Sequence, residues 1–242
     1  MTKAEDYWNQ FYSFSRPQNE LFIEFLSEKE NSFLNSQLYR LKKGKALDLG
    51  MGKGTNSLFL AANDFEVTGI DSSEVAIHKT KTLFENANLQ RSKNLKAEFL
   101  KTDMELHLFG ILQFDTIVMN YYKPQVSRVY DEIQRSLKYG GTVLIESFLI
   151  DEMNEILGPE DSYKNMFFKP NEVLKAFNSL RILFYNEGLI DGKQRVQCLA
   201  QKPYDKDIEK YNLFNMSHSK DKGENTPLSA QRKLAESLFK KK

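Results

Sequence analysis

A cluster of glycines follows the first apolar run of the chain, where a strand would end. Gly50, Gly52 and Gly54 come directly after Leu47–Leu49 and Gly44 precedes them, so four of the twelve glycines fall within eleven residues. Glycine lets the backbone adopt positive φ and lets a ligand approach it closely. The helix expected next would offer unpaired N–H groups at its first turn. An ordinary strand-to-helix turn needs fewer glycines, so the cluster predicts a ligand-binding turn.

The spacing of these glycines excludes two common nucleotide sites. The dinucleotide-binding turn has the pattern G-x-G-x-x-G, and Thr55 stands where its third glycine would be. A phosphate-binding P-loop needs Gly-Lys-Ser/Thr after a four-residue gap, which the cluster lacks. The chain has Asp48, Gly50, Gly52 and Gly54 in the order D-x-G-x-G-x-G. This order resembles the first motif of class I S-adenosylmethionine-dependent methyltransferases.

A carboxylate follows the second apolar run. Asp71 lies 21 positions after Gly50, at the end of Val67–Ile70. In a parallel sheet this is the edge that carries the glycine-rich turn, where a carboxylate can accept both hydroxyl hydrogens of a ribose. Asp71 has the alternative role of capping the next helix, but Ser72 and Ser73 can supply that cap. We therefore expect Asp71 to bind the ribose of an adenosine compound, with Ser72 beside it.

Two further residues are assigned through the resemblance. In the methyltransferases that the glycine motif resembles, an acidic residue after the third strand contacts the adenine amino group, and the next side chain flanks the ring. Asp103 and Met104 occupy these positions after the run Leu95–Leu100. Capping of a helix is the alternative role for Asp103. The resemblance thus implies S-adenosylmethionine as the cofactor and S-adenosylhomocysteine as the product.

The fourth apolar run ends in three side chains that face the same edge of the sheet, Asn120, Tyr121 and Tyr122. We expect Asn120 and Tyr122 to act beside the transferred methyl group, with a role as a core aromatic equally open for each tyrosine. The segment is only loosely similar to the Asn-Pro-Pro-Tyr box of enzymes that methylate nucleic acid bases, because both prolines are missing. The expected cofactor contacts are Asp48, Gly50, Gly52, Gly54, Asp71, Ser72, Asp103, Met104 and Asn120.

Short apolar runs rich in β-branched residues alternate with segments of helical period, which is typical of an α/β doubly wound, Rossmann-like sheet. The last two runs are joined by the glycine-containing segment Asn186–Lys193 rather than by a helix, which predicts a hairpin and an antiparallel strand. We expect a mostly parallel seven-stranded sheet. The runs are Ala46–Leu49, Glu66–Ile70, Leu95–Leu100, Asp115–Met119, Thr142–Glu146, Leu180–Tyr185 and Arg195–Ala200.

The Gly140-Gly141 pair before the fifth run and the final run Arg195–Ala200 add detail to the resemblance. Together with the preceding motifs, they resemble the small-molecule methyltransferases grouped with bacterial tellurite-resistance enzymes, over about residues 40–203. This resemblance implies the fold and the cofactor and leaves the acceptor open. Glu146, at the end of the fifth run, either faces the pocket or is paired structurally.

Three regions are expected along the chain. Residues 1–44 form an N-terminal helical cap, because Glu20–Leu41 carries apolar residues at helical spacing and Trp8 and Tyr12 would share one helix face. These two aromatic side chains either lie against the bound cofactor or acceptor, or pack within the cap. Residues 45–203 form the cofactor-binding domain. Residues 204–242 form a polar, partly disordered tail with a basic end.

The composition excludes several classes of protein. The 242 residues carry a formal net charge of +1, so no global field attracts nucleic acid or an anionic membrane. The chain has no signal-peptide pattern and no apolar stretch of membrane-spanning length, so we expect a cytoplasmic protein. The single cysteine, Cys198, is expected to be buried. The three histidines lack a second ligand at metal-binding spacing, so no metal site is predicted.

These observations predict a methyltransferase that moves a methyl group from S-adenosylmethionine to a small-molecule acceptor by in-line displacement, acting as a monomer or homodimer. No residue stands out as a base, although Asn120, a tyrosine or Glu146 would assist an amine or hydroxyl acceptor. Two alternatives remain: a cofactor-binding interaction protein without catalysis, and a methyltransferase of protein or nucleic acid that grips its partner with the basic tail. A dehydrogenase, which would have the same general fold, is a further alternative function.

Overall fold

A computed structural model of the chain describes residues 3–13, 27–91, 94–150, 166–204 and 206–207. The chain divides into two units, residues 1–202 and 203–242, and the first contains all the helices and strands named below. Most of the predicted tail 204–242 lies outside the described residues. Among the helices that the model describes, none combines the length and the apolar character needed to cross a membrane.

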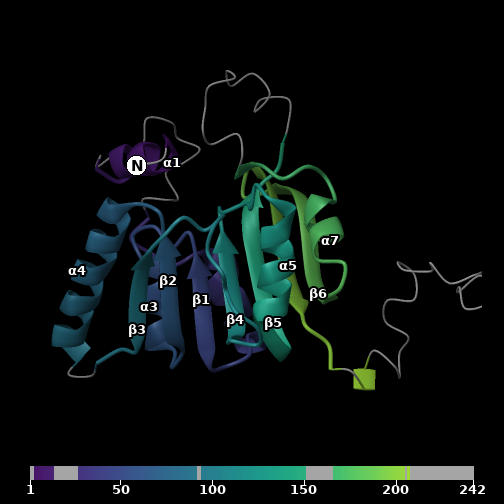
Figure 1. The fold of residues 1–242 in the computed structure, drawn as a ribbon, viewed down its shortest axis with the longest axis horizontal. Coiled ribbons are helices and arrows are strands. Elements are labelled where there is room, and N and C mark those ends of the chain that lie inside the picture. Colours follow the sequence, from purple (N-terminus) through teal and green to yellow (C-terminus); the bar gives the residue numbers. More distant parts are fainter. Residues whose placement is uncertain (1–2, 14–26, 92–93, 151–165, 205, 208–242) are drawn as a thin grey trace, which may run out of the picture. The chain divides into compact units, whose positions relative to one another are not determined.

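Seven strands form one sheet in the order β3-β2-β1-β4-β5-β7-β6. Strands β1 to β5 pair in parallel, and β7 is antiparallel to both of its neighbours (Figure 1). This confirms the predicted mostly parallel, Rossmann-like sheet with a C-terminal antiparallel hairpin. The strands are β1 (Lys45–Leu49), β2 (Glu66–Asp71), β3 (Ala97–Lys101), β4 (Phe114–Asn120), β5 (Leu137–Phe148), β6 (Arg181–Ile190) and β7 (Lys193–Gln201).

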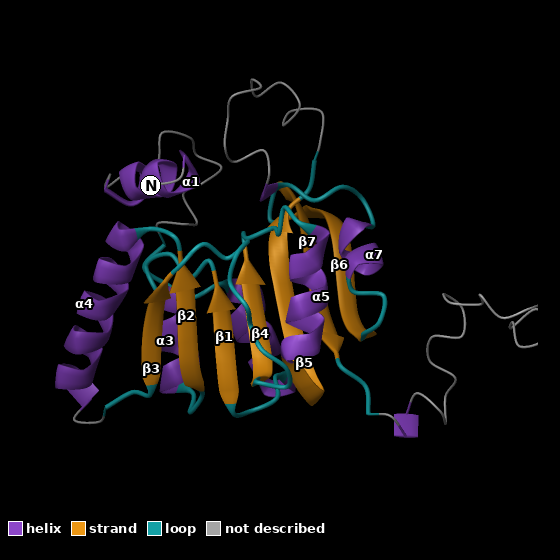
Figure 2. Ribbon diagram, viewed as in Figure 1, coloured by secondary structure: helices purple, strands orange, loops and turns teal. Residues whose placement is uncertain are grey.

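Successive residues of a strand point to opposite faces, and β1 therefore joins two apolar layers. Leu47 and Leu49 belong to a core cluster with Val129 of α5, whereas Ala46 belongs to a second cluster with Leu60 of α3. Figure 2 shows α5 in front of the sheet and α3 behind it. The helices are α1 (Lys3–Ser13), α2 (Ser32–Gln37), η2 (Leu38–Arg40, a 3-10 helix), α3 (Thr55–Ala62), α4 (Glu74–Arg91), α5 (Ser127–Ser136) and α7 (Glu172–Ala176).

A two-residue turn closes the β6–β7 hairpin. Ile190 pairs with Lys193, and the two residues between them, Asp191 and Gly192, have φ of 49° and 75°. Positive φ at both central positions is the requirement of a type I′ turn, for which Asp-Gly is a preferred sequence. Because β7 runs antiparallel, its first residues lie at the carboxyl end of β5, where Arg195 is the register partner of Phe148.

The N-terminal region is helical, but not as one continuous helix over Glu20–Leu41. Residues 20–26 lie outside the described residues, residues 27–31 are not helical, and α2 begins only at Ser32. The reason is a local cap: the side chain of Asn31 accepts a hydrogen bond from the backbone N–H of Leu34 at 2.8 Å. The helical spacing over Glu20–Leu41 is thus realised in part by α2, and the extent of the cap over residues 1–44 stays a prediction.

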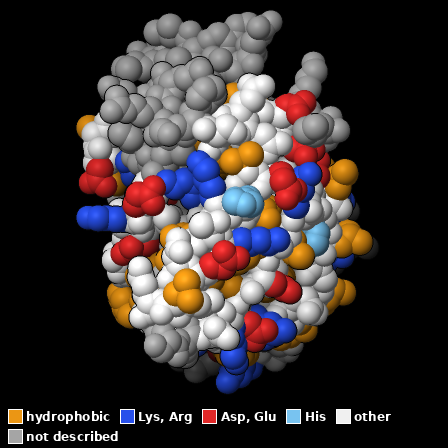
Figure 3. Space-filling view, turned by 90° about the vertical axis from the view of Figure 1, so that its left-hand side faces the viewer, with side chains coloured by type: hydrophobic (Ala, Val, Ile, Leu, Met, Phe, Trp, Pro, Cys, Tyr) orange, Lys and Arg blue, Asp and Glu red, His pale blue; other side chains and the backbone are white. Residues whose placement is uncertain are grey.

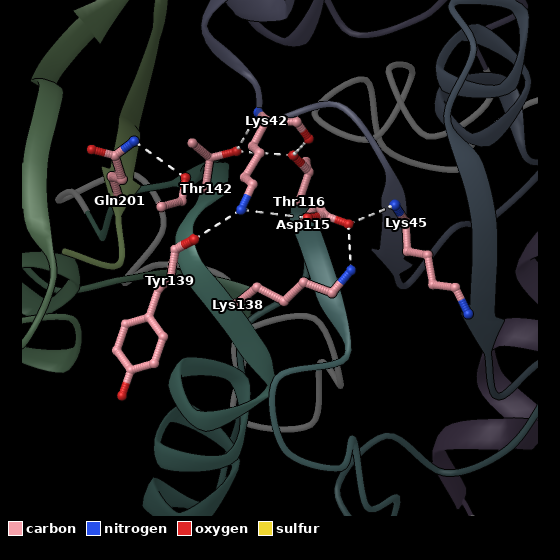
Figure 4. Close-up of polar contacts among 9 residues, drawn as sticks. Lys42, Lys45, Asp115, Thr116, Lys138, Tyr139, Thr142 and Gln201 are labelled. Carbon is pink, nitrogen blue, oxygen red and sulfur yellow. Dashed lines mark hydrogen bonds and ion pairs between the residues drawn. The ribbon is translucent and has the colours of Figure 1, made fainter. Parts of the chain in front are cut away.

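A charged cluster lies at the edge of the sheet opposite the glycine-rich turn (Figure 4). Asp115, 7% exposed, accepts hydrogen bonds from Nζ of Lys138 at 2.7 Å and from the backbone N–H of Lys45 at 3.0 Å. Nζ of Lys42 lies 3.5 Å from the other carboxylate oxygen. Burial acts to raise the pKa of Asp115, but these donors outweigh it and hold the pKa below its usual value.

Replacing Asp115 by Asn is expected to lower the free energy of unfolding by about 1–3 kcal/mol at pH 7, because two lysines lose their charged partner. Since the folded pKa of Asp115 is depressed, its stabilisation is present above the unfolded pKa and is lost as pH falls through the folded pKa. Urea unfolding at pH 3–7 measures both effects. The control is Glu66→Gln, whose pair with Lys45 is exposed; an equal loss in both variants would contradict the prediction.

Candidate functional site

The glycine-rich turn connects β1 to α3 by a backbone path that most residues avoid. Gly50, Gly52 and Gly54 all have positive φ, at 69°, 56° and 79°. The turn is fixed to the neighbouring strand, because the backbone N–H groups of Gly50 and Met51 both donate to the carbonyl of Ile70, at 2.9 and 3.1 Å. The predicted tight turn at the carboxyl edge of the sheet is therefore present.

Helix α1 reaches this turn through a tyrosine. A Cβ atom added to Gly52 would lie 2.7 Å from the hydroxyl of Tyr12, which is itself only 5% exposed. The helix is held over the carboxyl edge by polar contacts on its other residues. Oδ1 of Asn9 accepts a hydrogen bond from the Ser73 hydroxyl at 2.8 Å, and Glu5 pairs with Lys101 at 2.7 Å. As Figure 1 also shows, α1 covers the ends of β2 and β3.

Two buried carboxylates support the turn from below. Asp71 accepts hydrogen bonds from the backbone N–H groups of Gly52, at 3.0 Å, and Ser73, at 2.8 Å. Asp48 accepts one from the hydroxyl of Ser57 in α3, at 2.6 Å. Burial raises the pKa of each carboxyl to about 6. The cap of α4 is supplied by Ser73, whose hydroxyl accepts from the N–H of Ala76 at 3.1 Å.

A cavity of about 380 Å³ opens beside the glycine-rich turn. Asn120, at the end of β4, lines it and is 8% exposed. The amide nitrogen and oxygen of Asn120 are both buried, and neither has a hydrogen-bond partner among the described residues. A buried amide without partners is costly unless a ligand satisfies it. The described lining is Tyr12, Ser27, Lys29, Glu30, Asn31, Ser32, Gly50, Met51, Gly52, Lys53, Thr55, Asn56, Asn120, Tyr121, Asp191 and Arg195.

The two tyrosines after Asn120 point in different directions. Tyr121 lines the cavity and has a φ of 57°, which is unusual for a residue with a side chain. Its hydroxyl donates to Glu146 at 2.8 Å. Tyr122 packs its Cβ beneath Gly50 and donates its hydroxyl to Glu105 at 2.9 Å. The geometry therefore favours Tyr121 over Tyr122 beside a reacting group, and a catalytic role for Tyr122 stays a prediction.

The residues expected around the adenine ring are not part of the described cavity lining. Asp103 accepts a hydrogen bond from the N–H of Glu105 at 2.9 Å, which closes a turn after β3. Met104 is half-buried and packs against the first core cluster. Neither these two residues nor Ser72 appears among the lining residues. Their contacts with the cofactor stay predictions.

A buried polar network borders the cavity, and sequence reasoning missed most of it. Glu146 is fully buried and accepts hydrogen bonds from Asn31, Tyr121 and Gln197, while Arg195 forms an ion pair with it at 3.4 Å. The role of Arg195 could have been found from the predicted hairpin, because the first residues of an antiparallel strand lie at the carboxyl edge of its parallel neighbours.

In the described part of the chain, no group of three or more His, Cys, Asp or Glu side chains lies together in a way that could hold a metal ion. Cys198 is buried, as predicted, and burial raises the pKa of its thiol to about 12. A thiol of this kind is not a reactive nucleophile at neutral pH.

A family model described as "Tellurite resistance protein TehB" matches residues 2–195. The chain belongs to the TehB family. Among curated relatives, a sterol 24-C-methyltransferase of Aspergillus fumigatus is 28% identical over 202 aligned positions, and the match covers 76% of this family member and 52% of the relative. A ubiquinone biosynthesis O-methyltransferase of Rickettsia akari is 22% identical over 200 aligned positions, and the match covers 74% of each protein. The chain thus spans about half the length of the sterol enzyme.

Solved structures agree with this family at the level of the fold. A SAM-dependent methyltransferase from Methanosarcina mazei aligns with a TM-score of 0.57 and 22% identity, covering 73% of this TehB family member and 100% of that chain. TehB from Haemophilus influenzae aligns with a TM-score of 0.58 and 20% identity, covering 82% of this family member and 66% of that chain. The predicted methyltransferase family, fold class and S-adenosylmethionine cofactor are confirmed at the level of the family.

Gly52→Ala is expected to weaken S-adenosylhomocysteine binding at least tenfold, by about 1.4 kcal/mol or more, because the added methyl group displaces Tyr12 and strains the turn. Calorimetric titration measures the affinity. Gly192→Ala is the matched control: Gly192 has φ of 75° and open space around its Cβ position, so that variant tests backbone strain alone. Equal affinities in the two variants would show that the close approach of Tyr12 is unimportant.

Asp48→Asn is expected to change how the stability of the cofactor-free protein depends on pH. The raised pKa of Asp48, about 6, contributes stability that is complete below the unfolded pKa and is lost as pH rises through about 6. The free energy of unfolding of the variant relative to the wild type should therefore rise between pH 4.5 and 7.5, by about 2 kcal/mol. Urea unfolding across this range tests the slope, with exposed Asp131→Asn as control. A pH-independent difference would contradict the assignment.

Proposed function

We propose that the chain transfers a methyl group from S-adenosylmethionine to a small, polar acceptor. The observation that carries the proposal is the buried amide of Asn120, which has no hydrogen-bond partner among the described residues and lies in the same cavity as the glycine-rich turn. An amide both donates and accepts, so it can orient a polar acceptor or the amino acid portion of the cofactor. Asp71, at the neighbouring strand end, is the group that we assign to the ribose hydroxyls.

The protein contributes to this reaction by aligning the cofactor with the acceptor. When bound, S-adenosylmethionine supplies an electrophilic methyl group whose bond to sulfur breaks as the bond to the acceptor forms in line. The glycine-rich turn, fixed to Ile70 by two backbone hydrogen bonds, would hold the cofactor at one end of the cavity. Asn120 and Tyr121 line that cavity from the next strand. Fixing two reactants in this way converts a bimolecular reaction into an effectively unimolecular one.

Neither Glu146, beside the cavity, nor Tyr12, in its lining, is poised as a general base. The carboxylate of Glu146 already accepts hydrogen bonds from three side chains and pairs with Arg195. Burial, with the nearby Asp71 and Asp48 carboxylates, raises the pKa of Tyr12 well above 10, so its hydroxyl stays protonated. This favours an acceptor that is already nucleophilic at neutral pH, such as a thiolate or an oxyanion.

The described wall of the cavity argues for a small and polar acceptor. Tyr12, Met51 and Tyr121 are its only large apolar or aromatic side chains in the described ranges, and the rest of the lining is glycine or polar. A site for a sterol or a quinone would need a predominantly apolar wall. The names of two relatives, a sterol methyltransferase and a ubiquinone-pathway methyltransferase, therefore do not carry over as acceptors.

A ligand panel tests the proposal in two stages. S-adenosylmethionine and S-adenosylhomocysteine are expected to raise the melting temperature, whereas NAD and ATP are expected to leave it unchanged. Formation of S-adenosylhomocysteine is then measured with tellurite, selenite, dithiothreitol and catechol as probe acceptors. Asn120→Ala should lower kcat/KM at least tenfold, with the exposed Asn35→Ala as control. Cofactor binding without turnover on any acceptor would contradict the enzymatic proposal.

Deletion of residues 204–242 is expected to leave turnover of the small acceptor unchanged within about twofold. The described face that Figure 3 shows mixes acidic and basic side chains rather than presenting one uniformly basic area. Such a mixture gives no electrostatic footprint for a nucleic acid. Comparison of kcat/KM for the full chain and for residues 1–203 measures the effect. Loss of turnover in the shorter chain would favour a macromolecular acceptor that binds to the tail.

A further inference from the structure

We infer that Glu146 is a positioning residue that assembles the acceptor side of the cavity. This inference rests on the proposed function and deepens it, because it assigns the residue that holds the cavity wall in place. Glu146 lies near the end of β5 and is fully buried, so it does not itself contact an acceptor. Its effect must pass through the side chains that it binds.

Three cavity-lining residues converge on this one carboxylate. Nδ2 of Asn31 donates to Oε1 of Glu146 at 2.7 Å, and the hydroxyl of Tyr121 donates to the same oxygen at 2.8 Å. Nη1 of Arg195 lies 3.4 Å from that oxygen. The other oxygen, Oε2, accepts a hydrogen bond from Gln197. Glu146 therefore joins three parts of the cavity wall that are far apart in the sequence.

The sheet places these groups together. Glu146 is the register partner of Asn120 on β4 and of Gln197 on β7, so it lies between the two strands that contribute to the wall. Asn31 reaches it from the N-terminal region, where its Oδ1 also caps α2. Removing the carboxylate would therefore release an interaction from each segment at once.

Tyr121 is the residue that most needs this support. Its φ of 57° is a conformation that costs about 1–3 kcal/mol and persists only where the surroundings fix it. Its backbone N–H donates to the carbonyl of Glu146 at 2.8 Å, and its ring lies 4.9 Å from that of Phe148. Nη1 of Arg195 donates to the Tyr121 hydroxyl oxygen at 3.4 Å. The orientation of Tyr121 thus depends on Glu146 at two points.

The charge balance explains why a carboxylate serves here. A buried carboxylate is tolerated when it is paired and fully hydrogen-bonded, and Arg195 supplies the opposite charge. The pair orders a planar guanidinium, 5% exposed, in the wall of the cavity. Replacing Glu146 by Gln keeps the shape and the hydrogen-bonding oxygen but removes the charge, and replacing it by Ala removes both.

The experiment compares Glu146→Gln and Glu146→Ala with Asp115→Asn, a variant of another buried carboxylate that lies at the opposite edge of the sheet. Three quantities are measured in the full chain: the affinity for S-adenosylhomocysteine, the guanidinium NMR signals of Arg195 with that product bound, and KM and kcat for the probe acceptors. The Arg195 signals are assigned with Arg195→Lys. Tyr121→Phe, alone and with Glu146→Gln, completes a double-mutant cycle.

The expected result is that both Glu146 variants bind S-adenosylhomocysteine within about threefold of the wild type, lose the ordered Arg195 signals, and lower kcat/KM at least tenfold. The fold-loss of kcat/KM in the double variant should be smaller than the product of the fold-losses in the two single variants. Asp115→Asn should lower the melting temperature and change neither the Arg195 signals nor the acceptor kinetics. Unchanged Arg195 signals and acceptor kinetics in Glu146→Gln would overturn the inference.

Failure of the proposed function gives a different result. If the wild type turns over none of the probe acceptors, the proposed activity fails for this panel, while the spectra of the product-bound protein still decide the inference. Loss of the Arg195 signals in Glu146→Gln then supports the positioning role, and their retention contradicts it. Glu146→Gln carries this decision even if Glu146→Ala does not fold, because it preserves the size of the side chain.

Discussion

The parallel pairing of β1 with β2 and β4 is the constraint on which the site depends. It brings the carboxyl ends of these strands to one edge, so that the glycine-rich turn, Asp71 and Asn120 meet although they are far apart in the sequence. The antiparallel strand β7 then adds Arg195 at that same edge from the opposite chain direction. Each of these strands contributes a different part of the site, so the site depends on how they pair.

The sequence predicted the strands and the glycine-rich turn because both have strong local signals. An apolar run marks each strand, and closely spaced glycines favour a turn with positive φ, here 69°, 56° and 79°. Two features had no such signal. The helix start at Ser32 depends on the side chain of Asn31, and the different directions of Tyr121 and Tyr122 depend on one residue with positive φ. A local side-chain cap decides the first and the packing around Tyr121 decides the second, so hydrophobic periodicity alone predicts neither.

Buried acids serve different purposes at the two edges of the sheet. At the functional edge, burial raises the pKa of Asp48 and Asp71 to about 6, so at neutral pH both are held ionised at a cost to stability. At the opposite edge, lysines hold the pKa of Asp115 below its usual value, so its charge stabilises the fold. A protein that only needed stability would pair every buried acid as Asp115 is paired.

Glu146 shares features with both kinds of buried acid. It lies at the functional edge, yet it is compensated by Arg195 and by hydrogen bonds on both oxygens, as a stabilising acid would be. The side-chain amide of Asn120, on the neighbouring strand, has no such partner within the described part of the chain. The two side chains therefore serve different purposes. The amide of Asn120 is available to a ligand, and the carboxylate of Glu146 fixes the wall against which that ligand must lie.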